Sequence, residues 1–150
     1  SPEINEEGLK HRSLKLAAFQ KTLKPPKING DDEGEMLVVG WGSTRGAIEE
    51  AVQRLRDEGK KVSSMHLTFL QPMASGLREI MERFNKVMAV EISWCDDLDD
   101  ELIDADSRRY SNLAWLLRAR YLVDVDCWCQ VQGQPIKPRS IVKAIQDRLS

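Results

Sequence analysis

The glycine-rich segment 40–46, which reads GWGSTRG, is the part of the sequence most suggestive of chemistry. Glycines between a strand and a helix let backbone N–H groups approach an anion, and the helix N-terminus adds a favourable dipole. A dinucleotide-binding G-x-G-x-x-G loop needs glycine where this chain has Arg45, and no Gly-Lys-Ser/Thr closes a phosphate-binding P-loop. Close packing of a strand on a helix, with Ser43 or Thr44 as N-cap, explains the same residues without a ligand. The candidate anion-binding or interface loop comprises Gly42, Ser43, Thr44, Arg45 and Gly46.

Three aromatic or imidazole side chains are further candidates: Trp41, His66 and Trp128. His66 is predicted at the end of a strand, where an imidazole could act as a general base. No serine, cysteine or carboxylate stands at a spacing that would define a catalytic set, so a hydrogen-bonded structural histidine fits better. Trp41 is predicted on a loop and Trp128 on the outer face of an alternating strand, and tryptophan is enriched at interfaces. We therefore predict a protein–protein surface at these three residues.

The three cysteines do not form a recognisable motif. An odd count with wide spacing is typical of reduced thiols in a cytosolic protein. Cys127 and Cys129 would lie on one face of a strand, about 6.6–7 Å apart, a spacing of neither a Cys-x-x-Cys redox pair nor a cluster site. With only two histidines in the chain, a zinc site would need distant ligands. We predict that Cys95, Cys127 and Cys129 are small core residues and that no metal is bound.

Composition excludes several classes of protein. The 150 residues carry 22 Lys and Arg against 24 Asp and Glu, a net charge of −2, so a broad basic face for nucleic acid is not expected. No apolar run approaches the roughly 20 residues that cross a bilayer, so no membrane partner is expected either. The chain starts Ser-Pro-Glu-Ile, without methionine or a signal-peptide pattern. We expect a cytoplasmic protein and an excised piece of a larger polypeptide.

The elements that position these residues alternate along the chain. The predicted strands are 36–40, 61–67, 86–91 and 123–131. The predicted helices have their apolar faces within 47–55, 77–84, 110–120 and 138–149. Strands that alternate with helices through short connections pair in parallel and cross over right-handedly, which predicts an α/β fold.

Two segments stand apart from this alternation. Residues 1–35 are rich in charge, with apolar residues only loosely at helical spacing, and Pro25-Pro26 followed by a turn-rich stretch stops any helix. We predict a charged arm and Pro/Gly linker over 1–35 and an α/β domain over 36–150. A solvated connector is favoured for the arm over one that docks on a neighbour. The acidic segment 93–106 lacks the glycine of an EF-hand, so we predict a solvated loop.

The segment 39–47 and the helix that ends in LRDEG at 55–59 resemble the C-terminal domain of the α subunit of 2-oxoacid:ferredoxin oxidoreductases, the 2-oxoglutarate type above all. The order and spacing of further short matches support the resemblance over about residues 36–148. Those matches are at 66–67, 70–72, 90–91, 110–118, 133–135 and 141–145. Many relatives are shorter between Glu91 and Tyr110, so the acidic loop looks like an insertion.

The resemblance implies a transketolase C-terminal-like fold: three layers, with a mostly parallel sheet of about five strands and helices on both faces. The intact enzyme of that family decarboxylates a 2-oxoacid on thiamine diphosphate with Mg²⁺, passes electrons through iron–sulfur clusters to ferredoxin, and makes an acyl-CoA from CoA. This chain has no Gly-Asp-Gly diphosphate motif and no run of cluster-binding cysteines. We therefore expect no cofactor and no catalytic residue in this piece.

The resemblance thus predicts a non-catalytic structural domain. Its partners would be the other domains of the α subunit and the β subunit, with ferredoxin contacted only indirectly. An alternative is a ligand-binding module that holds a CoA or nucleotide phosphate at the Gly42–Gly46 loop. A third interpretation is a homodimerisation module.

Overall fold

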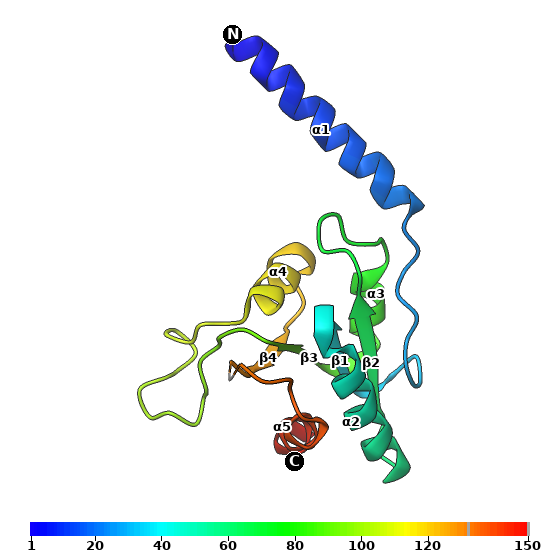
Figure 1. Cartoon of the computed structure of the whole chain (residues 1–150), viewed down its shortest axis with the longest axis vertical. Helices are drawn as coiled ribbons and strands as arrows, with labels where there is room; N and C mark the ends of the chain where they lie inside the picture. The colour runs from blue at the N-terminus through cyan, green and yellow to red at the C-terminus, as the bar shows by residue number, and fades with distance from the viewer. Residues whose placement is uncertain (132, 150) are drawn as a thin grey trace.

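The computed structural model describes residues 1–131 and 133–149, which form an α/β body and one projecting helix (Figure 1). Within the described residues the body holds a four-stranded, all-parallel sheet in the order β2-β1-β3-β4. The strands are β1 (Gly34–Trp41), β2 (Val62–Leu67), β3 (Phe84–Glu91) and β4 (Asp126–Cys129). The helices are α1 (Pro2–Thr22), α2 (Arg45–Asp57), α3 (Leu77–Glu82), α4 (Asn112–Tyr121) and α5 (Pro138–Leu149), with a 3₁₀ turn η1 (Gly42–Thr44) before α2.

The predicted α/β class, parallel pairing and helices on both faces are confirmed. The sheet has one strand fewer than the expected five, because the described segments outside it form helices and loops. The last strand is also shorter than the predicted 123–131. Only residues 126–129 pair with β3, from Met88 opposite Asp126 to Glu91 opposite Cys129.

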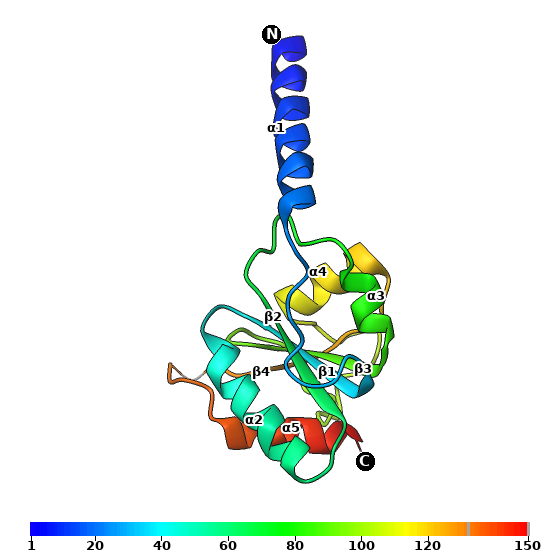
Figure 2. The same ribbon diagram turned by 90° about the vertical axis from the view of Figure 1, so that its right-hand side faces the viewer.

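Two apolar cores enclose the sheet. Helices α3 and α4 cover one face and α2 and α5 cover the other, as Figure 2 shows. Alternate strand residues feed the two layers: Leu37 and Val39 of β1 face the α3–α4 side, whereas Met36 and Val38 face the α2–α5 side. A parallel strand buried on both faces reads as a continuous apolar run, which is why residues 36–40 were recognisable from sequence.

Helix α1 leaves the body and has no buried residue (Figures 1 and 2). Ser1 caps it by accepting a hydrogen bond from the Ile4 N–H, and Pro2 occupies the first turn, where its missing N–H costs nothing. The segment expected to be a solvated connector is therefore a regular helix that ends at Thr22, before Pro25-Pro26. Good helix-forming residues outweigh its irregular apolar spacing.

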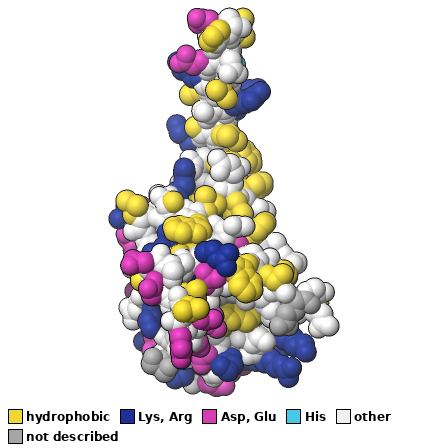
Figure 3. Space-filling model, turned by 90° about the vertical axis from the view of Figure 1, so that its left-hand side faces the viewer, with side chains coloured by type: hydrophobic (Ala, Val, Ile, Leu, Met, Phe, Trp, Pro, Cys, Tyr) yellow, Lys and Arg dark blue, Asp and Glu magenta, His cyan; other side chains and the backbone are white. Residues whose placement is uncertain are grey.

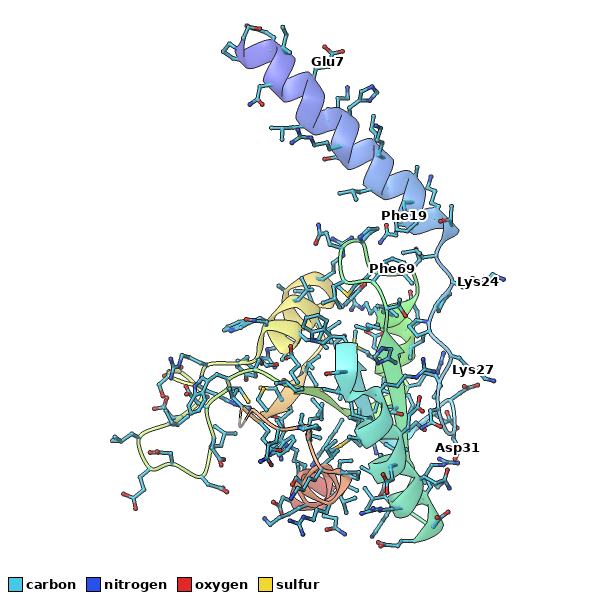
Figure 4. All side chains as sticks on the ribbon, in the orientation of Figure 1. Glu7, Phe19, Lys24, Lys27, Asp31 and Phe69 are labelled. Carbon is cyan, nitrogen blue, oxygen red and sulfur yellow. The ribbon has the colours of Figure 1, made fainter. Side chains whose placement is uncertain are left out.

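The last turn of α1 contacts the body. The Phe19 and Phe69 rings, labelled in Figure 4, pack edge to face with centroids 5.5 Å apart. The Gln20 side-chain amide donates to the Met73 carbonyl oxygen at 2.9 Å. No residue of the helix is buried against the described part of the chain.

Candidate interaction site at the carboxyl edge of the sheet

The glycine-rich loop connects the carboxyl end of β1 to α2. Gly42 has φ of +66°, a left-handed conformation that favours glycine, and it starts the 3₁₀ turn. Thr44 stands at the N-cap position of α2, but its hydroxyl donates back to the Trp41 carbonyl oxygen at 3.0 Å and makes no side-chain cap. Of the two N-caps predicted, Thr44 therefore holds the position without the hydrogen bond, and Ser43 lies inside the turn.

Close packing explains the first glycine of the segment. A Cβ built on Gly40 would lie 2.3 Å from Cδ1 of Ile48 and 2.9 Å from Oγ1 of Thr44, so only glycine lets α2 approach β1 this closely. Gly46 is different, because a Cβ there meets nothing within 4 Å. Part of the glycine pattern thus serves the helix–strand contact.

A cavity of about 360 Å³ lies beside this loop, between the linker after α1 and the end of β2. His66 contributes to it and pairs with Gly40 across the sheet. The lining also includes the basic residues Lys24, Lys27 and Arg45, of which Arg45 is paired with Glu49 at 2.9 Å. The two lysines come from the linker, where Figure 4 labels them.

The imidazole of His66 is set apart by its surroundings. Burial lowers the pKa of His66, the nearby Arg45 guanidinium lowers it further, and Glu49 partly opposes both. Its Nδ1 is buried without a hydrogen-bond partner. The hydrogen-bonded structural histidine expected from the sequence is therefore not found at this atom. The neutral imidazole is the favoured form near neutral pH.

The two candidate tryptophans lie in different places. Trp41 is the last residue of β1 rather than a loop residue; it is 42% exposed, and its indole N–H donates to Glu91 Oε1 at 3.0 Å. Trp128 is half-buried against the core on the α2–α5 side. The outer-face prediction for Trp128 is therefore wrong, since helices cover both faces of the sheet. The structure brings Trp41, the loop and His66 to the carboxyl ends of β1 and β2, and leaves Trp128 on β4.

Sequence reasoning missed a second cluster, in which Cys95, Cys127 and Cys129 line one cavity. The only local signal was the i, i+2 spacing of the two β4 cysteines. Cys95 lies on the loop between β3 and α4, and the position of a loop cannot be predicted from the periodicity of apolar residues.

Among residues 1–131 and 133–149, no group of three or more His, Cys, Asp and Glu side chains is placed to hold a metal ion. None of the described helices combines the length and apolar character needed to span a bilayer.

The fold is that of a transketolase-like α/β domain. A split-gene transketolase, solved as an inactive β4 tetramer, superposes with a TM-score of 0.55 at 19% identity, over 85% of this chain and 42% of that one. The 2-oxoglutarate:ferredoxin oxidoreductase from Magnetococcus marinus, solved with 2-oxoglutarate, coenzyme A and succinyl-CoA, superposes with a TM-score of 0.80 at 24% identity. That match covers 100% of this chain, including α1, and 24% of the longer chain.

Sequence comparison identifies the relatives more closely. The 2-oxoglutarate oxidoreductase subunit KorA from Mycobacterium tuberculosis is 36% identical over 111 residues, which are 72% of this chain and 14% of that protein. Alpha subunits of 2-oxoacid:ferredoxin oxidoreductases are further relatives. The predicted resemblance to these α subunits is confirmed, and the chain spans about one seventh of the length of the first of these relatives. No established family profile matches the sequence.

Proposed function

We propose that this chain is a non-catalytic structural and subunit-interface domain of a 2-oxoacid:ferredoxin oxidoreductase, with 2-oxoglutarate as the 2-oxoacid. The parent enzyme would convert the 2-oxoacid and CoA to acyl-CoA and CO₂ and reduce ferredoxin. The observation that carries this proposal is α1, a helix of 21 residues with no buried side chain. The homology to α subunits supports the choice of enzyme.

An isolated helix is marginal in water, and most helices in proteins are stabilised by packing of one face. Helix α1 exposes large apolar side chains along its length, and Figure 3 shows hydrophobic atoms running from it onto the body. These exposed side chains are Ile4, Leu9, Leu14, Leu16 and Phe19. Leu9 and Leu16, seven residues apart, share one face, and Phe19 lies close to that face. We assign this face to contact with the remainder of the α subunit.

The carboxyl edge is the second proposed contact. Trp41 and Arg45 are exposed beside the cavity that contains His66, and this combination of an aromatic ring and a cation is enriched in protein interfaces. We propose that Gly42, Ser43, Thr44, Arg45 and Gly46 serve as an interface loop. The phosphate-holding module considered from sequence is not favoured, because the relatives are subunits of multisubunit oxidoreductases.

The cofactors of the parent enzyme are proposed to lie elsewhere. Thiamine diphosphate, Mg²⁺, the iron–sulfur cluster and CoA would be held by other domains of the α subunit and by the β subunit, and ferredoxin would meet those parts. The described residues offer no metal-holding group. We place the assembled enzyme in the cytoplasm.

Two measurements test this proposal. The isolated chain, supplied with 2-oxoglutarate, CoA, thiamine diphosphate and Mg²⁺, should not reduce methyl viologen; turnover would contradict a non-catalytic role. In the full α/β enzyme, the double change Leu9→Glu with Leu16→Glu should reduce the assembled complex on size exclusion. The matched control is His11→Glu with Ala18→Glu, also seven residues apart but on the opposite face, which should assemble normally. Equal assembly of both double variants would show that α1 is not part of the interface.

A further inference from the structure

Three thiols meet at the carboxyl edge of β3 and β4. Cys127 and Cys129 lie on β4, where they pair with Ala89 and Glu91 of β3. Cys95 comes from the loop between β3 and α4 (residues 92–111) and packs against the α3–α4 core, which contains Cys127. All three are free thiols. Figure 1 shows this loop, in yellow-green, leaving β3 on the side of the sheet where β4 lies.

The position of Cys95 is fixed by its neighbour Asp96. The buried Asp96 carboxylate accepts from the Arg109 backbone N–H at 2.8 Å, from Arg109 Nε at 3.2 Å and from the Trp94 indole at 3.1 Å. The Asp96 N–H in turn donates to the Arg109 carbonyl oxygen at 2.9 Å. These bonds tie the two ends of the loop together, so Cys95 is held over β4 by a closed network.

Cys127 has the surroundings of a reactive thiol. It accepts hydrogen bonds from the Ser111 N–H at 3.5 Å and from Arg108 Nη2 at 3.6 Å. Ser111 is the N-cap of α4, and Arg108 is oriented by Asp126 at 2.6 Å. The interaction with Cys95 above all, then the Ser111 N–H and the Arg108 charge, lower the pKa of Cys127 to about 6 against its burial. The interaction with its neighbours raises the pKa of Cys95, which stays a thiol.

Cys129 is less suited to either role. It is half-buried and hydrogen-bonded to the Ser93 hydroxyl at 3.5 Å. The interaction with Cys95 lowers its pKa as well, against its burial and the charges of Cys127 and Glu91. Cys129 is, however, not among the residues of the α3–α4 core against which Cys95 packs. Cys127 and Cys129 are two apart on one strand, a separation of about 6.6–7 Å that lies at or beyond the limit for a disulfide. Cys95, which approaches from outside the strand, is the better partner for Cys127.

A cavity of about 750 Å³ gives small solutes access to the cluster. All three cysteines line it, together with Arg108 and Asp126. Cys127 itself is only 1% exposed, so a reactant there must be as small as water or hydrogen peroxide. The described residues offer no metal-holding group at this place.

We propose that Cys127 and Cys95 form a peroxide-reactive dithiol, with Cys127 as the attacking thiolate and Cys95 as the resolving thiol. The Cys127 sulfur attacks one oxygen of hydrogen peroxide and the O–O bond breaks, which gives a sulfenic acid and a hydroxide that is protonated to water. The Cys95 sulfur then attacks the sulfenic sulfur, and the hydroxyl group leaves with the Cys95 proton as a second water. Two thiols are oxidised to one disulfide and one peroxide is reduced to two waters. A cellular dithiol would restore the reduced form.

The test treats the whole 150-residue chain with hydrogen peroxide, alkylates the remaining thiols and maps the products by mass spectrometry without reduction. The expected product is an intrachain Cys95–Cys127 disulfide with Cys129 alkylated. Cys129→Ser should form the same disulfide at the same rate, which also avoids any change in the buried core. Cys95→Ser should stop at a Cys127 sulfenic acid that dimedone captures.

Several results would overturn the proposal. They are a disulfide between Cys95 and Cys129, failure of Cys129→Ser to form the bond, or oxidation of Cys127 no faster than that of thiols in the urea-unfolded chain. Retention of zinc by the reduced chain, lost only when all three cysteines are replaced, would indicate a metal site instead. None of these readouts depends on α1 or on a partner subunit, so the dithiol and the interface function can fail separately.

Discussion

Helix α1 and the α/β body differ in how much of their apolar surface is buried. In the body, both faces of the sheet are covered, and residues such as Leu37 and Leu117 are fully buried. In α1 no residue is buried, and the contacts at Phe19 and Gln20 join its last turn to the body. We therefore propose that the body folds from its own sequence, whereas α1 gains its stability from a partner surface. The body buries its own apolar residues and α1 does not, which is why we propose α1 as the interface element.

The largest expected effect separates the two regions directly. Leu37→Ala should lower the free energy of unfolding by about 2–5 kcal/mol, because it opens a cavity in the α3–α4 core. Leu14→Ala in α1 should change it by less than about 0.5 kcal/mol, since Leu14 is exposed. Urea unfolding of both variants of the isolated chain checks the contrast. Equal losses would mean that α1 unfolds as one unit with the body.

Substitutions at two glycines between β1 and α2 are expected to have opposite effects on stability. Gly40→Val should cost about 1–3 kcal/mol, because its side chain would overlap Ile48 and Thr44. Gly46→Ala, inside α2 with open space around it, should stabilise the chain by about 0.5–1 kcal/mol. Thermal unfolding measures both. A destabilising Gly46→Ala would mean that this glycine serves something other than the helix.

The body was largely predictable, and the reasons are local. The strand at 36–40 and the helix over 47–55 can both be recognised in the sequence. A strand buried on both faces is a continuous apolar run, whereas a helix buried on one face repeats its apolar residues every three to four positions. Helix α1 was not predictable as a helix, because its apolar residues follow helical spacing only loosely. The Cys95 cluster was not predictable either, because Asp96 and Arg109 close the loop across thirteen positions.

The acid dependence of the β3–α4 loop gives a smaller effect. Hydrogen bonds from Arg109 above all, with the Trp94 indole, lower the pKa of Asp96 to about 2. Because the folded pKa lies below the ordinary value, the carboxylate stabilises the loop above about pH 4, and this contribution is lost as the pH falls through about 2. Trp94 fluorescence should report the change between pH 5 and 2. Asp96→Asn should remove the transition, and an unchanged titration would contradict the assignment.

The smallest expected effect is at the exposed ion pair on α2. Arg45→Ala removes the bond to Glu49, a solvent-exposed i, i+4 pair, and should cost about 0.3–0.5 kcal/mol. In the assembled enzyme the same change should weaken subunit association more than it weakens folding, because Arg45 lies in the proposed interface loop. Chemical unfolding of the chain and sedimentation of the full enzyme measure the two effects. A larger loss in folding than in association would place Arg45 outside the interface.

Hydrogen–deuterium exchange of α1 tests the central claim most directly, with the isolated chain compared with the same segment in the full α/β oxidoreductase. We expect the backbone N–H groups of α1 to exchange rapidly in the isolated chain and to become strongly protected in the assembled enzyme, while β1 and β3 are protected in both. Rapid exchange of α1 in the assembled enzyme would contradict its role as an interface helix.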